Sequence, residues 1–233
     1  YRIVYEDSKH SKVSIMILSK DHPEVLKTCI SSIRQKTKYE NYEIIVIDNG
    51  SNKTNKEKYE KLSKEYQFLY HYEKLDFNFS KMCNIGAKLA KGDYYLFLND
   101  DTEVLQSEWL ERMLGQASQK HTGAVGAKLY YPNSLIIQHD GILNLRHGPS
   151  HVLMNHDDSK LYYYCNNRMD YNYIAVTGAC LMINKEKFDE VNGFDEKLPV
   201  AYNDVDLCFK LYEKGYYNVV RNDVKLYHYE SLS

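Results

Sequence analysis

Short apolar runs alternate with amphipathic segments through the first hundred residues. Four β-branched or aromatic runs predict strands, at Val13 to Leu18, Tyr42 to Asp48, Phe68 to Tyr72 and Asp93 to Asn99. Near-continuous apolar runs of this length are typical of strands buried on both faces. Helices are predicted between them, from Pro23 to about Gln35, from Thr54 to Tyr66, and from a cap at Ser80 to near Gly92. The alternation predicts an α/β fold with right-handed βαβ units and a mostly parallel, Rossmann-like sheet.

The second half of the chain loses this rhythm. The stretch from His147 to Tyr171 is polar and aromatic without a clear period. It predicts a long loop, which serves as a lid or binding segment unless it is disordered. The other predicted elements are a helix at Ser107 to Gln119, strands at Val125 to Tyr131 and Ile136 to Leu145, an ordered run at Tyr173 to Ile183, helices at Lys185 to Val191 and Asn203 to Lys214, and a last strand at Lys225 to Tyr229.

Composition limits the classes of partner. The 233 residues are 43% hydrophobic, which suits one domain with a large core, and the net charge of -2 provides no basic face for nucleic acid. No apolar run approaches the roughly 20 residues that a membrane span needs. The first residue is Tyr1, so we expect a piece of a longer protein, with any membrane association through regions outside it. Five scattered cysteines predict reduced, mostly buried thiols in a cytosolic compartment.

Two predicted strands end in acidic residues. Asp48 is followed by Asn49-Gly50-Ser51, a sequence that also serves simply to turn the chain. The other strand ends in Asn99-Asp100-Asp101, where two adjacent carboxylates repel each other unless a cation lies nearby. Mg²⁺ and Mn²⁺ are commonly held by one or two carboxylates together with substrate phosphates. The pair therefore predicts a divalent metal and a diphosphate ligand.

Further motifs follow one another along nearly the whole chain. They are Val13 to Lys20, Ser32 to Thr37, Ile47 to Ser51, Phe77 to Ser80 with Asn84 to Ala87, Gly92 to Asp101, Thr177 to Cys180, Gly193 to Glu196, Tyr202 to Cys208, and His228. In this order they resemble the family 2 nucleotide-sugar glycosyltransferases, which have the GT-A fold. Asn99 stands where the family's D-x-D motif has its first acid, which resembles the rhamnosyl- and galactosyl-transferring branch.

The resemblance implies roles on the nucleotide-sugar side. Asp48 is expected to contact the base or ribose, and Asn84, Asn99 and Asp100 to contact the donor. Asp101 is the expected metal ligand, although the motif leaves open whether Asp100 coordinates instead.

The late motifs imply the catalytic roles. Asp204 keeps the position of the catalytic base, with Asn203 where the family usually has Glu, and His228 is expected to complete the metal site or to contact the diphosphate. Simpler readings exist, because Asn203 makes a good N-cap, Asp204 would favour the helix dipole, and His228 on a strand is by default a half-buried histidine. A set of histidines without tight metal spacing is expected to line the loop. It comprises His139, His147, His151 and His156.

The resemblance implies a metal-dependent, inverting glycosyltransferase with Mn²⁺ or Mg²⁺. Its partners would be a UDP- or dTDP-sugar and a carbohydrate or glycolipid acceptor, in bacterial cell-surface polysaccharide or glycoconjugate synthesis, in the cytoplasm or at the cytoplasmic face of the membrane. Residues 1–101 would form the nucleotide-sugar-binding half of the domain and residues 102–233 the acceptor-side and catalytic half. The alternatives are a catalytically weakened sugar-nucleotide-binding domain and a nucleotidyltransferase. Against the latter, Ser19 to Pro23 lacks the glycines of a phosphate loop.

Overall fold

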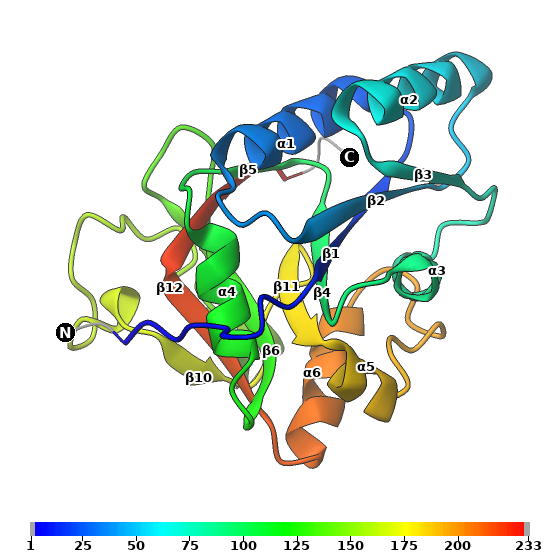
Figure 1. The fold of residues 1–233 in the computed structure, drawn as a ribbon. Coiled ribbons are helices and arrows are strands. Elements are labelled where there is room, and N and C mark those ends of the chain that lie inside the picture. The colour runs from blue at the N-terminus through cyan, green and yellow to red at the C-terminus, as the bar shows by residue number, and fades with distance from the viewer. Residues whose placement is uncertain (1–2, 231–233) are drawn as a thin grey trace.

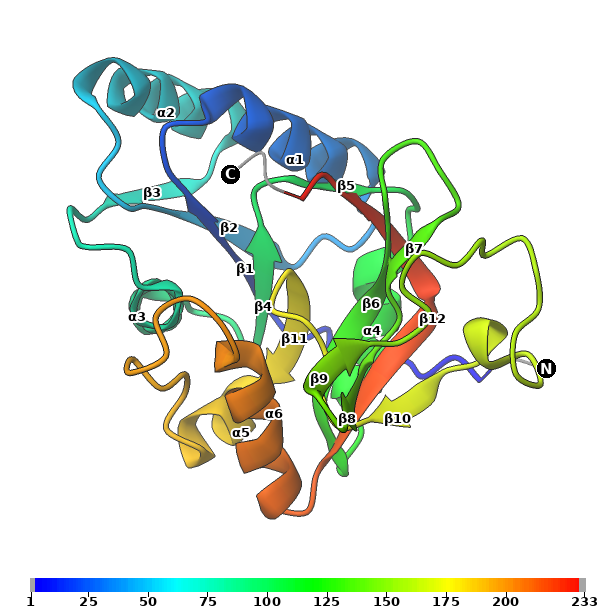
Figure 2. The same ribbon diagram turned by 180° about the vertical axis from the view of Figure 1, so that it is seen from behind.

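A single twisted sheet organises the chain (Figures 1 and 2). The computed structural model describes residues 3–230; residues 1–2 and 231–233, which the predicted domain also includes, lie outside the described residues. The strands are β1 Val13–Ser19, β2 Tyr42–Asp48, β3 Leu69–Tyr72, β4 Tyr94–Asn99, β5 Thr102–Val104, β6 Thr122–Tyr130, β7 Ile137–His139, β8 Ile142–Leu145, β9 Gly148–His151, β10 Tyr171–Tyr173, β11 Cys180–Asn184 and β12 Tyr217–His228. The helices are α1 Pro23–Lys36, α2 Lys53–Tyr66, α3 Phe79–Leu89, α4 Trp109–Ala117, α5 Lys185–Glu190, α6 Asn203–Glu213 and the 3₁₀ turn η1 Asn166–Arg168.

The sheet order is β10-β12-β6-β11-β4-β1-β2-β3. The strands of the first half, β4, β1, β2 and β3, pair with one another in parallel, as the alternation of strands and helices predicts. Strand β11 lies antiparallel between β4 and β6, and β12 runs parallel to β6. The α/β architecture is thus a parallel, Rossmann-like half joined edge to edge with a mixed second half.

Helices cover both faces of the sheet. Alternate residues of β1 serve different cores: Ile15 and Ile17 pack with α1, α2 and α4, whereas Met16 packs with α3, α5 and α6. Both faces of the central strands are therefore apolar, which explains their near-continuous hydrophobic sequences. Figure 1 shows α1 and α2 on one side of the strands and α3, α5 and α6 on the other.

The predicted strand from Ile136 to Leu145 is wrong in one respect, because it is divided into β7 and β8. Gly141 lies between the two strands with φ of +107°, a backbone conformation that side-chain-bearing residues rarely adopt. Strand β7 pairs with β6, whereas β8 pairs with β9 in a separate hairpin. The chain therefore leaves the main sheet at Gly141 and continues into the separate β8–β9 hairpin.

The stretch from His147 to Tyr171, predicted as a loop, is anchored by a buried polar cluster. Lys128 on β6 is fully buried, and its ammonium donates to Asp158 Oδ1 at 3.0 Å and to the carbonyl of Asn167 at 2.6 Å. Tyr130 donates its hydroxyl proton to Asp158 Oδ2. Apart from β9, η1 and the first residue of β10, the stretch has no helix or strand, so these contacts hold it to the sheet.

Two helix starts differ from the sequence prediction. Asn78, not Ser80, caps α3, because Asn78 Oδ1 accepts from the N–H of Lys81 while Ser80 donates to the carbonyl of Leu198. Helix α6 begins after Tyr202, a residue with φ of +62°, so Asn203 is the first helical residue rather than the cap.

The last strand begins earlier than predicted, at Tyr217 instead of Lys225. Its middle contains the buried polar residues Arg221, Asn222 and Asp223, which interrupt the apolar pattern. Four of the five cysteines are buried, as predicted; only Cys165 is partly open. None of the helices within residues 3–230 combines the length and apolar composition that crossing a bilayer requires.

Candidate active site

The ends of β4 and β12 and the start of α6 meet at the carboxyl edge of the parallel strands. Two consecutive residues before β11 connect them: Gly178 donates its N–H to Asp204 Oδ2 at 2.8 Å, and the carbonyl of Ala179 accepts from the N–H of Asn99 at 3.0 Å. In open α/β sheets ligands bind at this edge. The structure therefore brings the acids of the D-x-D-like motif and the first turn of α6 to one rim.

Asp101 and His228 face each other although 127 residues separate them in the sequence. Asp101 Oδ1 lies 3.1 Å from His228 Nε2, and Asn99 Nδ2 lies 3.2 Å from the same nitrogen. The Asp101 side chain is almost completely buried and that of His228 is 13% exposed. A carboxylate oxygen and an imidazole nitrogen thus meet at the end of β4.

Gln138 on β7 fixes the tautomer of His228. The Gln138 amide donates from Nε2 to Glu230 Oε2 at 3.1 Å, so its Oε1 faces His228 Nδ1, 2.6 Å away. A carbonyl oxygen only accepts, and His228 Nδ1 must therefore carry a proton. The lone pair of the neutral ring is then on Nε2, the nitrogen beside Asp101.

These two side chains fit a divalent cation. Adjacent ligands at right angles around an ion with bonds of about 2.1 Å are separated by about 3.0 Å, close to the spacing of Asp101 Oδ1 and His228 Nε2. Within residues 3–230 no group of three or more His, Cys, Asp and Glu side chains is arranged to hold a metal. The protein would supply two ligands, which leaves the remaining positions for diphosphate oxygens and water, as is common for Mg²⁺.

Asp100 makes its side-chain contact at the carboxyl end of β1. Its Oδ2 accepts from the Ser19 hydroxyl at 2.5 Å, and Ser19 Oγ lies 2.7 Å from the Tyr59 hydroxyl. Burial raises the pKa of Asp100 to about 7; the hydrogen bond from Ser19 opposes this rise, and the charge of Asp101 adds to it. With its neighbour Asp101 it lines a hollow of about 320 Å³ beside α1.

Asp204 is held by two backbone donors. Its Oδ1 accepts from the N–H of Val205 at 2.8 Å, and its Oδ2 accepts from Gly178. Asn203 Oδ1 in turn accepts from the N–H of Asp204 at 2.8 Å. Where the family usually has Glu, Asn203 thus helps to order the first turn of α6, and the carboxylate of Asp204 is fixed in direction while remaining partly exposed.

Asp48 and Asn84 have protein partners of their own. Asp48 is fully buried; its Oδ1 accepts from the N–H of Ser51 at 2.8 Å and its Oδ2 from the Tyr70 hydroxyl at 2.5 Å. This is the turn-forming role that the sequence also allows. Asn84 Nδ2 donates to the carbonyl of Phe194 at 3.0 Å, and its Oδ1 accepts from the Phe194 N–H, so this amide fastens α3 to the turn before α6.

Gln138 and Ser19 are site residues that the sequence reasoning missed. Gln138 and His139 follow Ile137 directly in β7, and both polar side chains are buried. Buried polar side chains need hydrogen-bond partners. Two adjacent polar residues in a predicted strand were therefore the signal by which the sequence could have identified Gln138.

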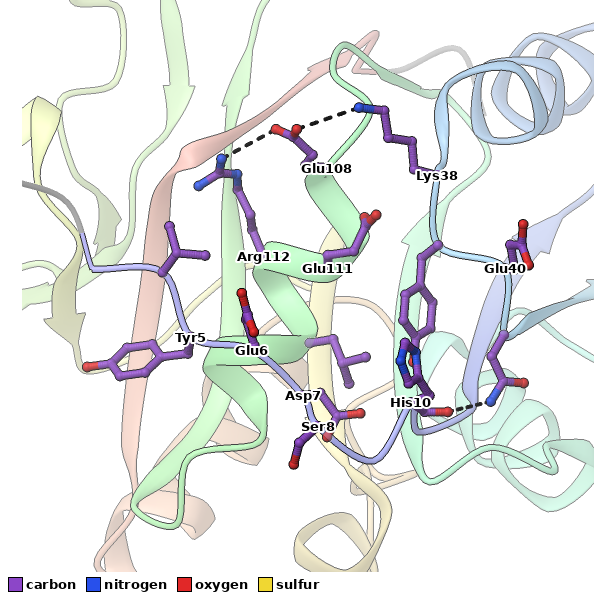
Figure 3. A pocket seen from close by; sticks show the side chains of 14 residues that line it. Tyr5, Glu6, Asp7, Ser8, His10, Lys38, Glu40, Glu108, Glu111 and Arg112 are labelled. Atoms are coloured by element: carbon purple, nitrogen blue, oxygen red, sulfur yellow. Dashed lines mark hydrogen bonds and ion pairs between the residues drawn. The ribbon is translucent and has the colours of Figure 1, made fainter.

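A second hollow, of about 760 Å³, lies on another part of the molecule (Figure 3). The segment from Val4 to His10 forms one wall and α4 another; Glu108 bridges Lys38 at 3.7 Å and Arg112 at 3.3 Å. Its lining includes Tyr39 to Asn41, which precede β2, so it opens at the amino ends of the parallel strands. The size of this hollow does not make it the candidate site, because ligands of such sheets bind at the opposite edge.

Known proteins are similar to this chain over all or most of its length. Residues 14–191 match the family described as "Glycosyl transferase family 2", a match that ends before Asp204 and His228. The chain is 37% identical over 239 residues to the uncharacterized protein y4gI of Sinorhizobium fredii and 31% identical over 247 residues to the O-antigen biosynthesis protein RfbC of Myxococcus xanthus. Both alignments cover 100% of this chain, but it spans only 26% of the first relative and 18% of the second.

Solved structures share the fold at low sequence identity. The crystal structure of GalNAc-T7 with UDP, GalNAc and Mn²⁺ superimposes with a TM-score of 0.76 at 19% identity, covering 95% of this chain and 44% of that one. The mannosyltransferase PcManGT of Pyrobaculum calidifontis, in complex with GDP-Man and Mn²⁺, gives a TM-score of 0.73 at 13% identity, covering 98% and 60%. At these identities both likenesses show the GT-A fold alone.

Proposed function

Because the chain belongs to glycosyltransferase family 2, we propose that it is a metal-dependent, inverting glycosyltransferase that moves a sugar from a nucleotide-diphosphate donor to an acceptor hydroxyl. The observation that carries the proposal is the 3.1 Å approach of Asp101 Oδ1 to His228 Nε2, with the ring nitrogen oriented by Gln138. The nucleotidyltransferase alternative is set aside by the family match.

Asp204 is proposed as the catalytic base. In a single in-line displacement, one group takes the proton of the acceptor hydroxyl while another part of the site stabilises the leaving diphosphate. Asp204 projects from the first turn of α6 with its carboxylate fixed by two backbone N–H groups, so the acceptor proton would pass to one of its oxygens. No covalent intermediate with the enzyme is needed.

Asp101 and His228 are proposed to hold Mn²⁺ or Mg²⁺. A divalent ion there would supply Lewis-acid stabilisation of the charge that develops on the diphosphate. Mn²⁺ accompanies UDP in the GalNAc-T7 structure and GDP-Man in the PcManGT structure. Asn99, Asp100 and Asp48 are proposed to contact the donor, a UDP- or dTDP-sugar. Asn84, whose amide is engaged with the turn at Phe194, is the weakest of the predicted donor contacts.

The similarity to an O-antigen biosynthesis protein supports a role in bacterial cell-surface polysaccharide or glycoconjugate synthesis, with a carbohydrate or glycolipid acceptor. The matched region is a small part of that relative, so the acceptor is proposed only as a class of molecule.

A donor screen tests the function. Thermal unfolding is measured with UDP-, dTDP- and GDP-sugars, each with and without Mn²⁺. A donor at 100 times its dissociation constant should stabilise the fold by about 2.7 kcal/mol, and only with the metal. Asp101→Ala should lose the metal-dependent stabilisation, while Glu65→Ala, an exposed acid on α2, should keep it. Absence of stabilisation by any donor in the unaltered protein would contradict the proposal. Donor binding without transfer or hydrolysis would indicate the catalytically weakened alternative.

A further inference from the structure

Two histidines outside the proposed metal site form a direct pair. His139 at the end of β7 is fully buried, and its Nδ1 lies 2.8 Å from Nδ1 of His151 at the end of β9. The ring planes are nearly perpendicular, at 79°. One of these nitrogens must donate and the other accept, so the pair fixes the protonation of both rings.

The direction of this hydrogen bond follows from Gly141. The N–H of Gly141 points to His139 Nε2 at 3.3 Å, and a backbone N–H only donates. His139 Nε2 therefore carries a lone pair. Burial lowers the pKa of His139 well below its usual value, which keeps the ring neutral and places its proton on Nδ1. Nδ1–H then donates to His151 Nδ1. His151, when neutral, is left with its proton on Nε2, the nitrogen that does not face His139.

His151 lies between the two parts of the proposed site. Burial lowers the pKa of His151; the Asp204 and Glu230 carboxylates act to raise it, and His228 acts to lower it further. The backbone pairing places His151 there: it pairs with Ile142, which bridges Ala175, three residues before the Gly178 N–H that donates to Asp204. On the other side, its ring partner His139 directly follows Gln138, which accepts from His228 Nδ1. Figure 2 shows the β8–β9 hairpin, which ends in His151, between α6 and β12, the elements that carry Asp204 and His228.

We propose that His151 is a specificity-determining residue that donates a hydrogen bond from Nε2–H to an oxygen of the sugar being transferred. This rests on the proposed function. In an in-line displacement, the base and the leaving diphosphate are on opposite sides of the anomeric carbon, so the sugar ring lies between Asp204 and the Asp101–His228 pair. A side chain near both of them faces that ring.

The fixed tautomer suits this role. A neutral N–H donor matches the lone pairs of sugar hydroxyl or ring oxygens. Because Nε2 already carries its proton, His151 does not compete with Asp204 for the proton of the acceptor. His139 acts only as a positioning residue, since its ring is buried behind His151.

The test compares each nucleoside diphosphate with its own sugar derivative. Dissociation constants are measured with Mn²⁺ for UDP, dTDP and GDP and for the matching nucleotide sugars. His151→Phe should bind the nucleoside diphosphate within about twofold of the unaltered protein but bind the nucleotide sugar about tenfold more weakly, the effect of losing one hydrogen bond. His151→Gln, which presents an N–H near the position of Nε2, should lose less. His147→Phe, at an exposed histidine in the turn of the same hairpin, is the matched control and should change neither constant.

Several outcomes overturn the inference. Unchanged nucleotide-sugar affinity in His151→Phe removes His151 from the sugar contact, and an equal loss for the nucleoside diphosphate assigns it to the diphosphate or to the fold. If His151→Phe does not fold, His151→Gln and nitrogen-15 NMR of the unaltered protein decide: an unprotonated His151 Nε2 would exclude the proposed donor. Failure of the unaltered protein to bind any nucleotide refutes the proposed function itself, whereas normal binding by all variants refutes only the role of His151.

Discussion

Gln138 Oε1 lies 2.6 Å from Nδ1 of His228, a residue 90 positions later in the chain. By accepting a hydrogen bond from Nδ1–H, Gln138 orients the ring so that Nε2 faces Asp101. Histidines that bind metals commonly donate their second ring N–H to such an acceptor, which fixes the tautomer and ring orientation. Strand β7 therefore contributes to the proposed metal site without contacting the metal.

Replacing Gln138 by Met should weaken metal binding while leaving the proposed ligands in place. Loss of the acceptor frees the His228 ring to rotate or change tautomer, and such changes typically reduce metal affinity by about 10–100-fold. Calorimetric titration of Mn²⁺ in the presence of the nucleotide identified by the donor screen measures the effect. Gln35→Met, at an exposed position on α1, is the control. Equal Mn²⁺ affinity in all three proteins would show that Gln138 does not position His228.

Asp204→Asn should stop transfer without preventing donor binding. The amide keeps the size of the side chain but is a far weaker base, and general-base catalysis contributes about 10²–10⁴-fold to rate. Steady-state turnover should fall by that factor, with the dissociation constant of the nucleotide sugar within about twofold of the unaltered value. Asp206→Asn, two residues further along α6, should retain most of the activity. Retained turnover in Asp204→Asn would assign the base to another residue.

The sequence predicts the parallel half of the fold well, because burial on both faces of β1, β2 and β4 produces long apolar runs. It fails where polar residues are buried by partners distant in the sequence. Arg221 interrupts β12 in the sequence, yet in the structure its guanidinium pairs with Asp223 at 2.9 Å and with Asp170 at 3.1 Å. Periodicity treats such a residue as exposed, so the first half of β12 was missed.

The candidate site could be predicted only in part, again because some of its polar residues have partners distant in the sequence. Asp101, Asp204 and His228 belong to motifs that a family resemblance identifies. Gln138 acquires its significance only from its contact with His228 on β12, and His151 only from its contact with His139 across the β7–β8 break at Gly141. A sequence read by period alone assigns that region to one continuous strand and a loop.

Asp140→Asn should make stability less dependent on pH. Burial raises the pKa of Asp140 from 3.8 to about 7, even though Lys128 lies 3.6 Å away and opposes the rise. Between about pH 4 and 7 the unfolded chain releases this proton while the folded protein retains it, so the contribution of Asp140 to stability falls as pH rises through this window. The loss is complete above pH 7 and amounts to at most about 4 kcal/mol.

The measurement is urea unfolding of both proteins from pH 4 to 8. The stability of Asp140→Asn relative to the unaltered protein should increase up to about pH 7 and then level off, once Asp140 is ionised in the folded protein as well. Asp76→Asn, at an exposed position, controls for removal of one carboxylate. A stability difference that does not vary with pH would mean that Asp140 is ionised throughout this range.

Gly141→Ala should be more harmful than Gly148→Ala, although both glycines have nearly the same φ, +107° and +106°. The conformational strain of alanine is therefore similar at the two sites, and their surroundings differ. A Cβ at residue 141 would lie 2.1 Å from Cδ2 of Tyr173, whereas one at residue 148 would have no heavy atom within 4 Å. Overlap of this kind adds about 1–3 kcal/mol to the cost, which urea unfolding of the two variants measures as a difference. Since Ile142 pairs with His151, Gly141→Ala should also weaken nucleotide-sugar binding more than Gly148→Ala does. Equal destabilisation of the two variants would show that Tyr173 moves aside without cost and that the break between β7 and β8 does not depend on this close approach.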